Sequence, residues 1–99
     1  MNCDVFDTYV TKSDGQMMHF DIIVPSGTAQ ETVFAFGQRY LASVSVNDGV
    51  ISAERCRFCH VETATPEMVA AIKQQGFFIL AMEGCPTIAP QTIKETIDE

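Results

Sequence analysis

The feature that most restricts the fold is a pair of strand-like runs, residues 4–11 and 16–24, on either side of Asp14-Gly15. Apolar and polar residues alternate along both runs, loosely in the first, which is typical of half-buried strands. Aspartate followed by glycine between two such runs is a strong signal for a tight β-hairpin. The sequence therefore predicts that the chain begins with two antiparallel strands joined by a short turn.

This turn also predicts which side chains share a face of the hairpin. With two central turn residues, Thr8 pairs with Asp21 and Val10 pairs with His19. One face is then apolar, and the other carries Thr8, His19 and Asp21 among apolar neighbours. A carboxylate can orient an imidazole for acid–base work. Because no serine or cysteine is placed by sequence as a nucleophile, we expect His19 and Asp21 to form a surface pair without catalytic activity.

The rest of the chain alternates between helical and strand-like segments. Residues 28–44 open with a Thr-Ala-Gln-Glu capping box and continue with apolar residues at helical spacing. Residues 50–58 are predicted to form a third strand. Residues 65–75 form a second predicted helix, which opens with Thr-Pro-Glu and stops at Gly76. The uninterrupted apolar run 77–82 is typical of a strand covered on both faces.

Together these elements predict an α+β fold in the order ββαβαβ. We expect both helical crossovers to join parallel strands with right-handed connections, giving a four-stranded mixed sheet. Both helices are expected on one face, as a two-layer sandwich, because two layers suffice for a chain of this size. The last strand then lies at the sheet edge. Residues 1–88 are predicted to form one domain, and residues 89–99 a polar tail in which a short helix would carry Ile93 and Ile97.

Charge and length exclude several classes of function. The 99 residues suit one domain, and 13 acidic residues against 6 basic ones give a net charge of −7. We expect no nucleic-acid partner and no anionic membrane surface, since both attract cationic proteins. No apolar run approaches the roughly twenty residues of a membrane span. The first residues show no basic segment followed by an apolar one, so a cytoplasmic location is expected.

Three cysteines and a histidine stand where two strands are predicted to end. Cys56, Cys59 and His60 form a C-x-x-C-H run that closes the third strand, and Cys85 follows the fourth. Thiolate and imidazole groups in this number suit a tetrahedral zinc ion. Because parallel strands end at the same side of a sheet, we expect these four side chains to converge around zinc. The chain must then turn near Phe58, since residues three apart in a straight strand point to opposite faces.

Other chemistry stays open for the same residues. Buried cysteines often serve only as small apolar side chains. A redox pair of Cys56 and Cys59 is a second interpretation, although thioredoxin-like sites place the first cysteine at a helix N-terminus, which is absent from this pattern. C-x-x-C-H is also the attachment signature of c-type haem. That chemistry takes place outside the cytoplasm, and the absence of an export signal disfavours it.

Four short strings of the sequence carry a resemblance to a known family. They are Phe6-Asp7-Thr8-Tyr9-Val10, Met18-His19-Phe20-Asp21, Cys56-Arg57-Phe58-Cys59-His60 and Met82-Glu83-Gly84-Cys85. In combination the chain resembles a family of small bacterial proteins known as domain of unknown function 2024. The likeness covers roughly residues 4–85 and leaves the tail outside. It implies a small stand-alone α+β protein and brings no activity with it.

The expected function is that of a small acidic domain that self-associates, without enzymatic activity and with a structural zinc ion as candidate cofactor. Self-association follows from the apolar run 77–82, because an apolar strand at a sheet edge pairs readily with a second copy. Two alternatives are a thiol-based redox protein or enzyme that uses Cys56 and Cys59, and a binding module that uses the open face of the sheet. No catalytic residue is predicted.

Overall fold

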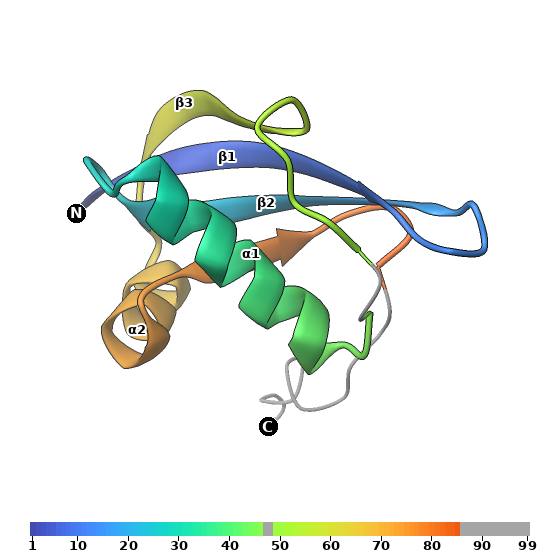
Figure 1. Cartoon of the computed structure of the whole chain (residues 1–99). Coiled ribbons are helices and arrows are strands. Elements are labelled where there is room, and N and C mark those ends of the chain that lie inside the picture. Colours follow the sequence, from blue (N-terminus) through green and yellow to red (C-terminus); the bar gives the residue numbers. More distant parts are fainter. Residues whose placement is uncertain (47–48, 86–99) are drawn as a thin grey trace, which may run out of the picture.

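The computed structural model of the chain describes residues 1–46 and 49–85 (Figure 1). Its elements are β1 (Asn2–Thr11), β2 (Met17–Pro25), α1 (Gln30–Ser43), β3 (Cys56–Thr63), α2 (Pro66–Gln75) and β4 (Phe78–Ala81). The predicted α+β class and the order ββαβαβ are confirmed. The third strand begins six residues later than expected. The tail helix predicted within residues 89–99 lies outside the described residues.

The sheet is antiparallel throughout, in the strand order β3-β1-β2-β4. The expectation of a mixed sheet is therefore wrong. The first crossover does join two strands of the same direction, β2 and β3, but β1 lies between them. The second crossover joins β3 to β4, which run in opposite directions at opposite edges. The predicted edge position of β4 is confirmed.

One face of the sheet, here called the α1 face, is covered by α1 (Figure 1). Val33, Tyr40 and Leu41 of α1 are buried against it. Gly37 lets the helix approach closely, because a Cβ there would stand 3.0 Å from the Ile22 side chain. The strand residues in this core are Phe6, Val10, Met18, Phe20, Ile22, Val24 and Cys56.

The opposite face, here called the α2 face, is covered in part by α2. Ile72 of α2 packs on Val5 and Ile23 in a second, smaller core with Cys3. The expectation that both helices share one face, as a two-layer sandwich, is therefore not met. The reason lies in β2, where Ile22 and Ile23 point to opposite faces and are 0% and 2% exposed. A strand buried on both sides needs a cover on both sides.

The hairpin turn differs from the predicted one by a single residue. Lys12 N–H donates to the Gln16 carbonyl at 2.8 Å, which closes a three-residue loop with Gly15 at φ 87°. Such a loop is a common alternative to the two-residue turn and also favours glycine at its end. Asp14 Oδ1 accepts a hydrogen bond from the Gln16 N–H at 2.9 Å. Because side chains alternate, one extra loop residue changes which residues of β1 and β2 pair across the sheet.

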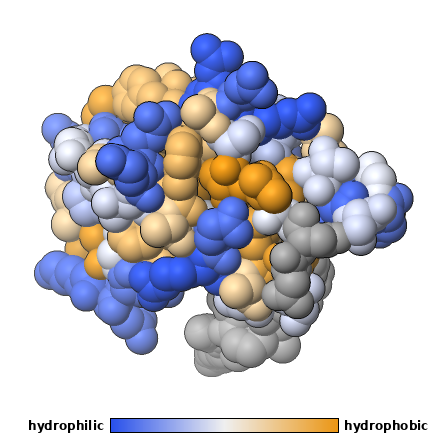
Figure 2. Space-filling view, in the orientation of Figure 1, coloured by the Kyte–Doolittle hydropathy of each residue, from blue (hydrophilic) through white to orange (hydrophobic). Residues whose placement is uncertain are grey.

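The surface of the molecule is mixed. In the orientation of Figure 1, Figure 2 shows polar residues along the rim and apolar residues gathered near the middle of the view. Large apolar side chains stay exposed on both edge strands, among them Phe58 and Val61 of β3 and Leu80 of β4. Among the described residues, no helix is long and apolar enough to cross a membrane.

Candidate functional site

Three ionisable side chains meet on the α2 face, beside the part that α2 covers. Asp7 of β1 pairs with Asp21 of β2, and the next pair along this face is Tyr9 with His19. One potential ligand atom each from Asp7, His19 and Asp21 lies within 4.8 Å of the other two. In the described part of the chain, this is the one group of three or more such donors close enough to share an ion.

The contacts within this Asp7/His19/Asp21 cluster fix the imidazole from two sides. His19 Nε2 lies 2.5 Å from Asp7 Oδ1. The Tyr9 ring stacks on the imidazole with centroids 4.2 Å apart and planes 6° from parallel. The His19 and Asp7 side chains are 20% and 38% exposed, whereas Asp21 is 9% exposed. The cluster is thus open to solvent on the Asp7 side and closed on the Asp21 side.

The electrostatics of the cluster disfavour two ionised carboxylates. Burial raises the pKa of Asp21, and the neighbouring charge of Asp7 raises it further, while His19 and His60 act in the opposite direction. A hydrogen bond between the Asp21 and Asp7 carboxyl groups also raises the pKa of Asp21. A pair of this kind gains stability from a shared proton or from a nearby cation.

The sequence predicted part of this cluster. His19 and Asp21 share a face, as expected, but they are not the expected surface pair, because Asp21 is buried and His19 contacts Asp7 instead. Thr8 lies on the opposite, α1 face, where its hydroxyl donates to Cys56 Sγ at 3.3 Å. Asp7 was missed because the predicted register was one residue out. The signal that could have found it is Ser-Asp-Gly read as a three-residue loop with glycine last. The absence of acid–base chemistry at His19 and Asp21 stays a prediction.

Two chemical uses suit an imidazole and two carboxylates at this spacing. The three groups can act as nitrogen and oxygen ligands of a divalent metal ion, leaving positions open for water or another ligand. They can also pass a proton, since an imidazole held by a carboxylate can act as acid or base. The second use requires a substrate beside the imidazole. The Tyr9 ring occupies one of its faces.

The C-x-x-C-H residues all lie on the open edge strand β3. Cys56 is fully buried on the α1 face, and burial raises the pKa of its thiol, although the Thr8 hydroxyl acts in the opposite direction. Cys59 is exposed, at an irregularity where the pairing of β1 with β3 shifts by one residue. His60 is also exposed and lies 2.9 Å from Glu62, measured from Nε2 to Oε1.

Cys85 follows β4, at the opposite edge of the sheet from this run, and packs like Cys56 against the core of the α1 face. Its thiol donates to the His19 carbonyl of β2 at 3.4 Å. It also neighbours the Tyr40 hydroxyl, whose pKa is raised by burial first and by Cys85 second.

The predicted convergence of Cys56, Cys59, His60 and Cys85 is therefore wrong. It assumed parallel strands that end together, whereas β3 and β4 run in opposite directions with β1 and β2 between them. The Cys85 thiol lies beside β2, which β1 separates from β3, and in the described part of the chain no three of these side chains are close enough to share an ion. Zinc binding by these residues stays a prediction, and their placement does not favour it.

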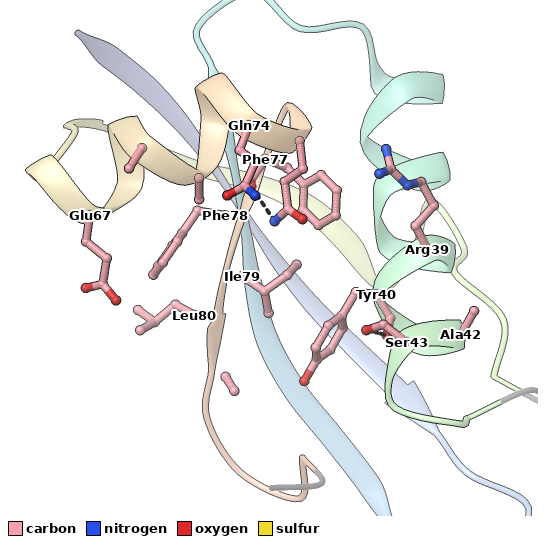
Figure 3. A pocket seen from close by; sticks show the side chains of 14 residues that line it. Arg39, Tyr40, Ala42, Ser43, Glu67, Gln74, Phe77, Phe78, Ile79 and Leu80 are labelled. Carbon is pink, nitrogen blue, oxygen red and sulfur yellow. Dashed lines mark hydrogen bonds between the residues drawn. The ribbon is translucent and has the colours of Figure 1, made fainter. Parts of the chain in front are cut away.

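A groove runs along the second edge strand, β4 (Figure 3). Figure 3 shows Tyr40 and Arg39 of α1 on one side of β4 and Glu67 and Gln74 of α2 on the other, with Leu80 on β4 between them. The unpaired edge of β4 is thus recessed between the two helices. Seven of the eight residues of β3, the other edge strand, are exposed.

The chain is a small α+β domain with an open four-stranded antiparallel sheet and a polar cluster on one face. The model of a family described as domain of unknown function (DUF2024) matches residues 1–82. The chain belongs to that family, and the resemblance seen in its short strings is confirmed.

A solved structure supports the same fold. The NMR structure of protein NE1680 from Nitrosomonas europaea, a structural genomics target, is 41% identical in sequence, with a TM-score of 0.76. The similarity covers 87% of this chain and 100% of that one. The comparison with curated proteins gave no match.

Proposed function

We propose that the protein is a binding domain that holds a divalent transition-metal ion on the α2 face, with Asp7, His19 and Asp21 as its protein ligands. The observation that carries this proposal is the mutual distance of their donor atoms, all within 4.8 Å. The proposal keeps the idea of a binding module on an open sheet face. It replaces the cysteine-based zinc site with a cluster of nitrogen and oxygen donors.

The donor atoms need a moderate adjustment to hold an ion. A zinc ion lies about 2.1 Å from nitrogen and oxygen ligands, so the ligand atoms around a tetrahedral zinc ion are about 3.4 Å apart. The 2.5 Å contact between Asp7 Oδ1 and His19 Nε2 therefore has to open, and donor atoms as far apart as 4.8 Å have to close. Rotation of Asp7, the most exposed of the three side chains, is expected to supply most of this adjustment, because Tyr9 stacks on His19 and burial holds Asp21.

The two carboxyl groups of Asp7 and Asp21 also favour a divalent cation at this site. A divalent cation between Asp7 and Asp21 removes the repulsion and the burial penalty that raise the pKa of Asp21. Three protein ligands leave at least one coordination position open, which is the pattern of sites that bind a further ligand. Imidazole with carboxylates suits Zn²⁺, Mn²⁺ and related ions better than soft Cu⁺, which prefers sulfur.

Thiol-based redox chemistry, the main alternative, has less support. The thiolate is the reactive form of cysteine, and burial raises the pKa of Cys56. Cys56 is also 0% exposed and hydrogen-bonded to Thr8, whereas Cys59 is exposed. A redox pair needs both sulfurs accessible to each other and to a partner thiol.

The proposal is tested by titrating the metal-free chain with Zn²⁺ in a calorimeter and with Co²⁺ in a spectrophotometer. We expect one ion per chain, with cobalt absorption bands in the visible and no thiolate-to-cobalt charge transfer in the near ultraviolet. Asp21→Asn and His19→Ala should each weaken binding at least ten-fold, since even residues that only support metal ligands change affinity by about 10–100-fold.

The matched control is the second histidine–carboxylate pair. His60 lies beside Glu62 much as His19 lies beside Asp7, but among the described residues it belongs to no group of three close donors. His60→Ala should change the affinity much less than His19→Ala, because His60 acts on Asp21 through its charge and not as a ligand of the proposed ion. Equal losses in the His19 and His60 variants, or no ion bound by the unaltered chain, would overturn the proposal. Loss of binding in Cys59→Ser together with a thiolate band would instead support the cysteine site.

A further inference from the structure

The outer edge of β3 is the most exposed strand edge of the molecule. Seven of its eight residues are exposed, and only Cys56 is buried. Phe58 and Val61 are 55% and 54% exposed, which is unusual for two large apolar side chains on one short strand. Natural sheets normally protect such an edge with charge, proline or a covering segment.

The hydrogen bonds to β1 show which backbone groups of β3 face outwards. Tyr9 N–H donates to the Arg55 carbonyl, and Ala64 N–H donates to the Met1 carbonyl, so these residues mark the two ends of the ladder. Backbone direction alternates along a strand, with one irregularity opposite Val5 and Phe6. The residues that turn their N–H and C=O groups outwards are then Cys56, Phe58, Val61 and Thr63.

We propose that two copies of the chain pair through β3 as antiparallel strands, with Phe58 opposite the partner's Val61 and Arg57 opposite the partner's Glu62. The two-fold axis passes between Cys59 and His60. In this register the outward-facing backbone groups of Phe58 pair with those of the partner's Val61. Each contact occurs twice by symmetry.

The side chains of β3 are complementary to themselves in this register. On the α1 face, Phe58 meets an apolar residue, and its ring already packs edge-on against Phe6. On the α2 face, Arg57 meets a carboxylate, and oppositely charged cross-strand pairs stabilise a sheet while like pairs destabilise it. The irregularity near Cys59 lies at the axis in both copies, so both strands carry the same extra residue between their paired segments.

The other edge strand, β4, is a poorer place for a second copy. Its edge is recessed between α1 and α2, so two such edges meet only if the helices of both copies pass each other (Figure 3). It is also only four residues long, half the length of β3. We therefore expect self-association through β3, the C-x-x-C-H strand, and not through β4, the apolar strand that the sequence favoured.

A charge exchange tests the pairing by sedimentation equilibrium at micromolar concentration. The unaltered chain should sediment at twice 10.9 kDa. Arg57→Glu and Glu62→Arg should each weaken the dimer at least ten-fold, and the double variant should restore it. Lys73→Glu and Glu67→Arg are the matched controls, because they change the net charge equally on the exposed surface of α2, and they should leave the dimer intact.

A second measurement does not depend on charge variants. Cys59 lies next to the proposed axis, so a short bis-maleimide should join two chains through it. The covalent dimer should disappear in Cys59→Ser and persist in Cys85→Ser. A single species near 10.9 kDa in the unaltered chain, equal effects in the β3 and α2 variants, or no recovery in the double variant would each overturn the proposal.

Discussion

The two faces of the sheet are covered to different extents. On the α1 face, Phe20 and Ile22 are 0% exposed beneath a helix of 14 residues. On the α2 face, a helix of 10 residues covers Val5 and Ile23 and leaves the next positions along the strands to the Asp7/His19/Asp21 cluster. Both faces belong to the same two central strands, so the difference comes from the helices and from the alternation of side chains.

This contrast shows how a small domain gains room for a polar site. A chain of this size supports one main core, and here that core lies on the α1 face. On the α2 face, a covering helix is needed only where the strand residues that point to this face are apolar. Where the sequence places a carboxylate or an imidazole instead, the surface stays open, and a partly buried Asp21 is the result.

The largest expected difference between the faces is in stability. Phe20→Ala removes a fully buried ring from the α1 face and should lower the free energy of unfolding by about 3–5 kcal/mol. Leu80→Ala, on the α2 face and 42% exposed, should cost less than about 1 kcal/mol. Urea denaturation measures both, and similar losses would show that the two faces are equally important to the fold.

A smaller loss of stability is expected for a substitution of Gly76, which precedes two residues that pack on opposite faces of the sheet. It ends α2 at φ 99°, so that Phe77 enters the core of the α1 face while Phe78 packs on the α2 face. Gly76→Ala should cost about 1–2 kcal/mol for the left-handed backbone, with more from a Cβ placed 2.9 Å from the Phe36 ring. Thermal unfolding checks this. Gly27→Ala, at φ 91° with open space around it, separates the backbone cost from the contact with Phe36.

The smallest expected effect concerns the pH dependence of stability. The pKa of Asp21 is raised in the folded chain, so between the unfolded value of about 3.9 and the folded value the folded state binds more protons. Its contribution is therefore favourable at low pH and is lost as the pH rises through the folded pKa. Without metal, Asp21→Asn should be more stable than the unaltered chain at pH 7 and should lack this dependence.

Urea titrations at a series of pH values measure this effect, and Glu54→Gln serves as the control at an exposed carboxylate. A less stable Asp21→Asn variant at pH 7 would contradict the prediction. Added Zn²⁺ should reverse the order, because the metal stabilises the unaltered chain by binding its folded state.

Local signals predicted the second helix better than the first. Thr65 caps α2 by accepting the Met68 N–H at 3.2 Å, and Gly76 ends it, both as expected. At α1, the capping box expected from Thr28 does not form, because the Thr28 hydroxyl donates to the Pro25 carbonyl at 2.6 Å and Ala29 becomes the cap. A hydroxyl near a helix start has several backbone partners, and the local sequence alone does not choose among them.

The sequence by itself determined the order of the elements, the presence of the hairpin, the shared face of His19 and Asp21, and the family. These depend on residues close together in the chain, whose periodicity and turn chemistry are visible in the sequence. The tertiary structure decided the loop length, the strand order and the placement of the helices on opposite faces. Each of these features depends on the difference in free energy between alternative folds of the whole chain. One loop residue therefore moved Asp7 into the cluster, and one strand order separated Cys56 from Cys85.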